Sequence, residues 1–112
     1  MRRLFGPSTA VVLAAVLLIA GAAAAADNEI PLTIEKGQFQ PTEVKVKANT
    51  PFVLVVTNKG TKAAEFESKD LRVEKVVPAG KTVNVRIRAL KPGTYAFFDD
   101  FNKAVNGRIV AE

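Results

Sequence analysis

Short runs in which apolar and polar residues alternate one by one constrain the fold of this chain more than any other feature. The clearest run places Val83, Val85 and Ile87 between polar neighbours. A period of two puts every second side chain on the same face of an extended strand, which is typical of a half-buried β-strand. The same alternation occurs over residues 32–35 and 43–47, and no window of ten residues after residue 26 has a clean period of 3.6. The chain is therefore predicted to be all-β.

Turn-forming residues separate these runs at regular intervals. Glycine, proline and asparagine favour the backbone conformations of tight turns. The continuous apolar run Phe52–Val56 is predicted to be a strand buried on both faces. Seven to eight short strands at this spacing predict an antiparallel Greek-key β-sandwich. The predicted turns are centred on residues 36–37, 48–51, 58–60, 78–80 and 91–93.

The first 26 residues have the pattern of a secretory signal peptide. Arg2 and Arg3 precede an apolar stretch over residues 10–20, and alanines at 24–26 supply the small residues that signal peptidase requires. We expect cleavage between Ala26 and Asp27, which gives a signal peptide at 1–26, a single domain at 27–112 and a periplasmic location. An N-terminal membrane anchor is the alternative, although residues 10–26 are at the short end of the range for a membrane span.

The composition excludes several classes of site. The chain has no cysteine, no histidine and no tryptophan, and its one methionine is Met1. Zinc fingers, redox dithiols and histidine-dependent catalytic dyads or triads are therefore impossible. Haem and blue-copper sites are excluded as well, because both depend on histidine, cysteine or methionine ligands.

The charge balance gives no reason to expect a nucleic-acid partner. The whole chain has 16 basic and 11 acidic residues and a net charge of +5. Removal of residues 1–26 takes away two arginines and no acid, which leaves a net charge of +3. The remaining basic residues alternate with apolar residues on predicted strands, a pattern typical of a solvated sheet face rather than of a DNA- or RNA-binding surface.

Two separated motifs resemble a known family. The run Lys91-Pro92-Gly93-Thr94-Tyr95-Ala96-Phe97 resembles the Pro-Gly-x-Tyr-x-Phe segment that leads into the last metal loop of cupredoxins, and Asn58 lies where cupredoxins have an Asn-rich turn. The segments Glu65-Phe66-Glu67-Ser68 and Asp99-Asp100-Phe101 resemble the EfeO-type cupredoxin-like domain, whose members are small periplasmic proteins of bacterial iron uptake. This resemblance covers residues 30–110 and implies a cupredoxin-like sandwich.

Carrying the resemblance over residue by residue shows that the copper ligands are missing. The first histidine position of copper-binding cupredoxins corresponds to Glu65, the cysteine position to Asp99, and the second histidine position to Asn102. The axial methionine has no counterpart. No type 1 copper centre can form, because that centre requires a thiolate ligand. Copper is expected only as a weakly held, oxygen-ligated ion.

Carboxylates stand at or next to these positions. Glu65 and Glu67 are two residues apart on a predicted strand and so project from one face, and Asp99 and Asp100 follow the next motif strand. Hard oxygen ligands suit Fe(III), Mn(II), Ca(II) or Mg(II), and the resemblance favours iron. We predict a metal site at Glu65, Glu67, Asp99 and Asp100, with Glu74 as a supporting residue. The alternative is an ordinary polar rim, in which Asp99 and Asp100 form a polar turn and Glu65 and Glu67 are solvated and paired to Lys69, Arg72 or Lys75.

Two functions follow from these alternatives. The first is an exported protein that holds iron and passes it to a membrane iron permease or another periplasmic iron-uptake protein. The second is a metal-free β-sandwich that serves as an interaction module for another exported protein. No catalytic residue is predicted, and an auxiliary ferroxidase role would require a partner protein.

Overall fold

The computed structural model describes residues 28–112, so the predicted signal peptide and its cleavage point lie outside the described residues. The described chain forms nine strands. Their bounds are β1 Glu29–Glu35, β2 Gln38–Gln40, β3 Glu43–Val46, β4 Phe52–Asn58, β5 Ala64–Ser68, β6 Val73–Val77, β7 Thr82–Ile87, β8 Gly93–Asp99 and β9 Asn102–Ala111. Residues 28–112 contain no helix long and apolar enough to cross a membrane.

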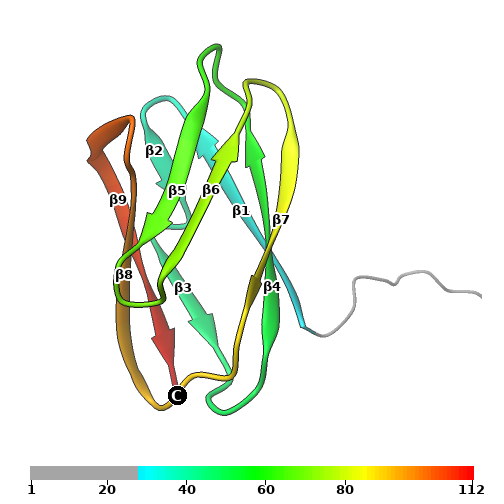
Figure 1. The fold of residues 1–112 in the computed structure, drawn as a ribbon, viewed down its shortest axis with the longest axis vertical. Helices are drawn as coiled ribbons and strands as arrows, with labels where there is room; N and C mark the ends of the chain where they lie inside the picture. Colours follow the sequence, from blue (N-terminus) through cyan, green and yellow to red (C-terminus); the bar gives the residue numbers. More distant parts are fainter. Residues whose placement is uncertain (1–27) are drawn as a thin grey trace, which may run out of the picture.

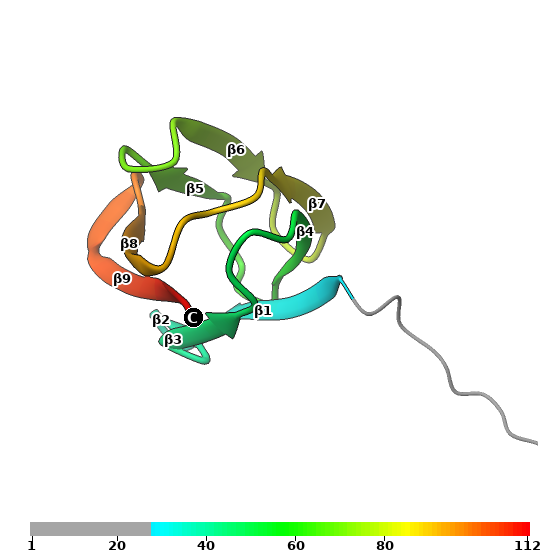
Figure 2. The same ribbon diagram turned by 90° about the horizontal axis from the view of Figure 1, so that it is seen from below.

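The strands form two sheets that face each other (Figures 1 and 2). One sheet has the order β2-β1-β4-β7 and the other the order β3-β9-β8-β5-β6. The predicted all-β sandwich is confirmed, with nine strands rather than seven or eight. The sheets are mixed rather than purely antiparallel, because β1 runs parallel to β4 and β3 runs parallel to β9.

The hydrophobic core lies between the sheets and is built from alternate residues of the strands. Three phenylalanines at its centre have no exposed surface: Phe39 from β2, Phe66 from β5 and Phe97 from β8. The ring of Phe97 meets Phe39 edge-on, with centroids 4.9 Å apart, and lies 5.1 Å from Phe66. Edge-to-face and offset arrangements at these distances are favoured by the ring quadrupoles. These aromatic contacts join the two sheets.

Two strands differ from the sequence-based expectation. The run Phe52–Val56 lies in β4 and alternates between buried and half-buried residues, so the predicted burial on both faces is wrong. Strand β4 is covered on one face only, because its sheet packs against a single partner sheet. The three-residue strand β2 was not predicted, and it follows the predicted turn at Lys36 and Gly37, whose φ angles are 54° and 74°.

Gly107 of β9 lies where a side chain has no room. A Cβ atom at this position would come within 2.7 Å of the Phe97 ring and 2.7 Å of the carbonyl oxygen of Thr42. We therefore expect Gly107→Ala to lower the free energy of unfolding by about 1–3 kcal/mol, because the backbone or the core ring must move. Urea unfolding of the variant measures this loss. Asn106→Ala, an exposed neighbour on the same strand, is the control and should cost much less.

Candidate metal site

Glu65 and Glu67 project from the outer face of the five-stranded sheet. In β5, the buried residues Ala64, Phe66 and Ser68 alternate with these two half-buried glutamates. The period of two therefore sends the apolar side chains into the core and both carboxylates to the outside. Both glutamates lie on the same face, as the sequence predicts.

Asp100 and Glu74 join the two glutamates from the strands on either side. The main-chain N–H of Asp100, just after β8, donates a hydrogen bond of 2.9 Å to the carbonyl oxygen of Glu65. On the other side, Glu74 of β6 stands directly opposite Glu67 in the antiparallel register. Carboxylate oxygens of Glu65, Glu67, Glu74 and Asp100 all lie within 4.8 Å of one another. We call these four residues the acidic group.

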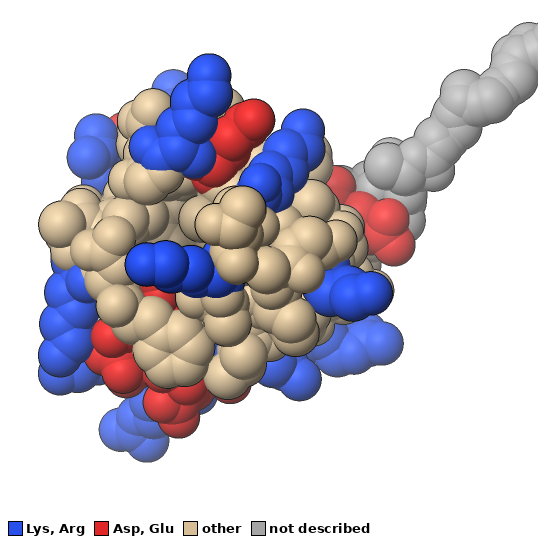
Figure 3. Space-filling view, turned by 90° about the horizontal axis from the view of Figure 1, so that it is seen from above, with Lys and Arg blue, Asp and Glu red and all other residues tan. Residues whose placement is uncertain are grey.

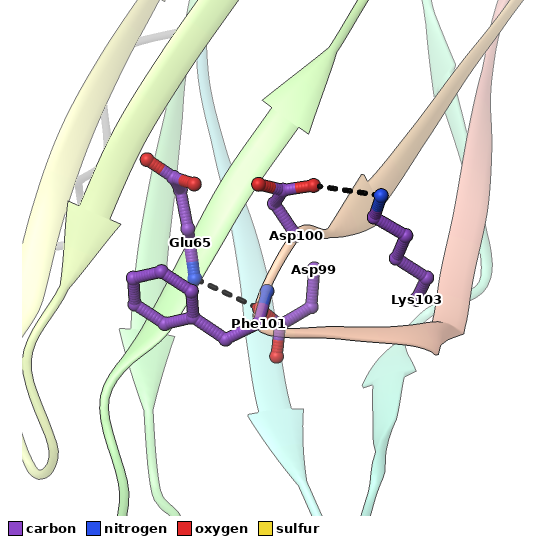
Figure 4. A network of polar contacts seen from close by, with 5 residues as sticks. All are labelled: Glu65, Asp99, Asp100, Phe101 and Lys103. Atoms are coloured by element: carbon purple, nitrogen blue, oxygen red, sulfur yellow. Dashed lines mark hydrogen bonds and ion pairs between the residues drawn. The ribbon is translucent and has the colours of Figure 1, made fainter.

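Asp99 lies outside the acidic group, although it neighbours Asp100 in sequence. It is opposite Phe66 in the β5–β8 register, so its side chain points to the core side, and it is only 6% exposed. Its Oδ1 atom accepts hydrogen bonds of 2.9 Å from the main-chain N–H groups of Glu65 and Phe101. Figure 4 shows the Asp100 and Glu65 carboxylates side by side and the Asp99 side chain directed away from them. The structure thus brings together three of the four predicted ligands and Glu74, the residue predicted to support them.

Burial and neighbouring carboxyl groups determine the electrostatics of Glu65. The pKa of Glu65 is raised from 4.5 to about 7, first by burial and then by the neighbouring carboxyl groups of Glu74 and Asp100. Both causes disfavour the charged form of a carboxyl group. Glu65 is therefore partly protonated near neutral pH when no cation is present.

Few basic side chains neutralise the acidic group. Within residues 28–112, its one ion pair joins Asp100 to Nζ of Lys103 at 3.6 Å, and the Lys103 side chain is 72% exposed. Lys69, Arg72 and Lys75 form no ion pair with these acids in the described part of the chain, contrary to the polar-rim alternative. Figure 3 shows this end of the molecule from above: red acidic residues gather at the lower left, others lie at the top and right, and blue basic side chains lie on all sides.

The raised pKa of Glu65 predicts a pH-dependent stability for the metal-free protein. The folded state keeps the Glu65 proton up to about pH 7, whereas the unfolded chain releases it near 4.5, so the folded state binds more protons in this interval. Stability should therefore fall as the pH rises from about 4.5 to 7. Urea unfolding at several pH values, with chelator present, measures this for the wild type and Glu65→Gln. Parallel pH profiles for the two proteins would contradict the prediction.

Comparison with protein-family models identifies the family of this chain. The model of the cupredoxin-like domain matches residues 8–111. The chain belongs to the cupredoxin-like domain family. This cupredoxin-like protein is also 37% identical over 75 residues to an uncharacterized protein of Rickettsia prowazekii (strain Madrid E). That match covers 67% of this chain, and the chain spans 60% of the length of the relative.

Several solved structures share the fold of this cupredoxin-like protein. Amicyanin from Paracoccus versutus has a TM-score of 0.60 at 15% identity, with 79% of this chain and 85% of amicyanin covered. Auracyanin from Roseiflexus castenholzii has a TM-score of 0.63 at 13% identity, with 79% of this chain and 99% of auracyanin covered. The metal-binding domain of the Cu(I)-exporting P-type ATPase CopA of Streptococcus pneumoniae has a TM-score of 0.67 at 14% identity. The match covers 80% of this chain and 92% of that domain.

The residues of this cupredoxin-like protein do not fit a type 1 copper ion. The chain has no cysteine and no histidine, and the Oδ1 atom of Asp99 already accepts two main-chain hydrogen bonds. A cavity of about 350 Å³ lies at this end, lined among others by Asn58, Asp99 and Asn102. Amide and carboxylate oxygens cannot replace the thiolate and imidazole ligands on which a type 1 centre depends. The candidate metal site is therefore the acidic group on the outer face.

Proposed function

We propose that this cupredoxin-like protein binds a hard metal ion, iron in the first place, through Glu65, Glu67 and Asp100, with Glu74 as a fourth ligand. The observation that carries the proposal is the convergence of four carboxylates within 4.8 Å with one exposed lysine as their ion-pair partner in residues 28–112. Clustered carboxylates repel one another unless a cation lies among them. Oxygen ligands alone favour Fe(III), Mn(II), Ca(II) and Mg(II) over Cu(I).

We further propose that the protein is exported and passes its iron to a membrane permease or another periplasmic iron-uptake protein. Two features support this role. The first 26 residues have the pattern of a signal peptide, and the Glu65–Ser68 and Asp99–Phe101 segments resemble the EfeO-type domain of iron uptake. The acidic group is half-buried rather than enclosed, apart from Glu74, which is exposed. An open site of this kind suits release to a partner.

An interaction module without metal is the second candidate function. It is favoured by Phe101, which is 57% exposed in the turn between β8 and β9. A large exposed aromatic side chain is a common anchor in protein interfaces. Both functions place the partner at the same end of the molecule.

Titration of the purified chelator-treated protein with Fe(III)-citrate and Mn(II) tests the proposed function. A ligand that binds only the folded state raises the melting temperature by an amount that grows with the logarithm of its concentration over its dissociation constant. The melting temperature should rise with either metal, and it should keep rising as the free metal concentration increases above the dissociation constant. A protein whose melting temperature is unchanged at millimolar metal would support the interaction module instead.

Copper(II) should give a pale complex at most. No thiolate is available for the charge-transfer band that colours blue-copper proteins, which falls at roughly 600 nm. Any bound Cu(II) should have the weak absorption of an oxygen-ligated tetragonal ion. Absorption spectroscopy of the purified protein with one equivalent of Cu(II) measures this, and an intense blue colour would overturn the ligand assignment.

A further inference from the structure

Asp99 is a buried carboxylate at the position where the cupredoxin resemblance places the copper thiolate. The side chain is 6% exposed, and within residues 28–112 no lysine or arginine forms an ion pair with it. Two main-chain N–H groups instead donate to its Oδ1 atom. A buried charge needs such donors, because burial without them is costly.

The bond from Glu65 N–H to Asp99 Oδ1 and one main-chain bond join the two chain segments that carry Glu65 and Asp100. Asp100 N–H donates to the carbonyl oxygen of Glu65, and Glu65 N–H donates to Asp99 Oδ1, both at 2.9 Å. At this end, strands β5 and β8 are therefore also linked through the side chain of Asp99. The bond from Phe101 N–H to the same oxygen fixes the start of the turn that follows Asp100.

We infer that Asp99 has become an internal anchor in place of a metal ligand, and that it is the positioning residue that holds Glu65 and Asp100 together on the outer face. Asp99, the last residue of β8, points inward, whereas Asp100, the first residue of the turn, places its carboxylate beside that of Glu65 on the outer face. One residue thus fixes the backbone from inside, and the next presents its carboxylate outside (Figure 4). The part of this inference that concerns metal rests on the proposed function.

Two substitutions of Asp99 separate an anchor from a ligand. Asp99→Asn keeps an Oδ1 acceptor of the same shape and removes the charge, whereas Asp99→Ala removes the acceptor. An anchor needs the acceptor, so Asp99→Asn should bind Mn(II) within about threefold of the wild type and Asp99→Ala at least tenfold more weakly. A ligand needs the charge, so in that case both variants would lose affinity to a similar extent.

The experiment combines calorimetric titration with Mn(II) and ¹⁵N NMR of the three proteins, well below their melting temperatures. In the NMR spectra of Asp99→Asn, the amide signals of Glu65 and Phe101 should keep their chemical shifts and their slow hydrogen exchange. In Asp99→Ala, both signals should shift and exchange faster. The amide of Glu43, at the far side of the sheet, is an internal control and should not move.

The outcomes distinguish this inference from the proposed function. A wild type that binds no Mn(II) and no Fe(III)-citrate would overturn the proposed function and the metal-positioning role with it, whatever the amide signals show. A wild type that binds metal, with Asp99→Asn and Asp99→Ala equally impaired, would overturn the anchor and make Asp99 a ligand. The anchor role would also be overturned by unchanged metal affinity in both variants, or by unchanged amide signals in Asp99→Ala.

Discussion

Replacing Glu65 with Gln should remove most of the stabilisation expected from bound metal while leaving the metal-free form as stable or slightly more stable at neutral pH. Glu65 is in contact with both Glu74 and Asp100, and their repulsion contributes to its raised pKa. A neutral amide relieves that repulsion in the metal-free protein. The same amide is a poorer ligand for a hard ion than a carboxylate, so the metal affinity should fall at least tenfold.

Thermal melts of wild type and Glu65→Gln at pH 7.5, with and without Fe(III)-citrate, measure both effects. Glu29→Gln is a matched control, because Glu29 lies on β1 of the other sheet and the change removes the same charge away from the acidic group. The control should respond to metal as the wild type does. If metal raises the melting temperature of all three proteins by the same amount, the acidic group is not the binding site.

The polar-rim alternative predicts a different result for the same substitution. Under that alternative, Glu65 would lose a favourable basic partner, at a cost of a few tenths of a kcal/mol for an exposed pair. The metal-free Glu65→Gln variant would then be less stable, not more, and metal would have no effect on either protein. The absence of an ion pair from Lys69, Arg72 or Lys75 to the acids within residues 28–112 favours the first result.

The sandwich could be predicted because the alternation of apolar and polar residues shows which face of each strand is buried. Strand β7 alternates in the sequence, and in the structure its apolar residues Val85 and Ile87 are buried while its polar residues are exposed. The parallel neighbours β1 and β4 could not be predicted, since pairing between segments far apart in the chain leaves no local pattern. The short strand β2 has one apolar residue, Phe39, which is too little for a visible period.

The acidic group could be predicted in part for the same reason. Tyr95 and Phe97 share a face, and continuing that period places Asp99 with them and Asp100 opposite. This alternation could have been followed to the end of the strand, and it separates Asp99, the proposed anchor, from Asp100, the proposed ligand. The position of Glu74 could not be obtained this way, because it depends on the register in which β6 folds back on β5.

Replacing Phe97 with Ala should cost about 3–5 kcal/mol of the free energy of unfolding, the usual range for deleting a buried phenylalanine. Phe97 is fully buried, meets the rings of Phe39 and Phe66, and fills the space left by Gly107. A domain of this size has a total stability of roughly 5–15 kcal/mol, and no disulfide supports it. The variant should therefore unfold at much lower urea concentration than the wild type.

Phe98→Ala provides the matched control for this large effect. Phe98 is the next residue of β8, is only half-buried, and lies on the outer face opposite Glu67. Its loss should cost much less than the loss of Phe97, since much of its surface already contacts water. Urea unfolding of both variants measures the difference between the two faces of one strand. Equal losses would mean that the core does not centre on the three buried phenylalanines, and that the inward phase of β8, on which the separation of Asp99 from Asp100 depends, is wrong.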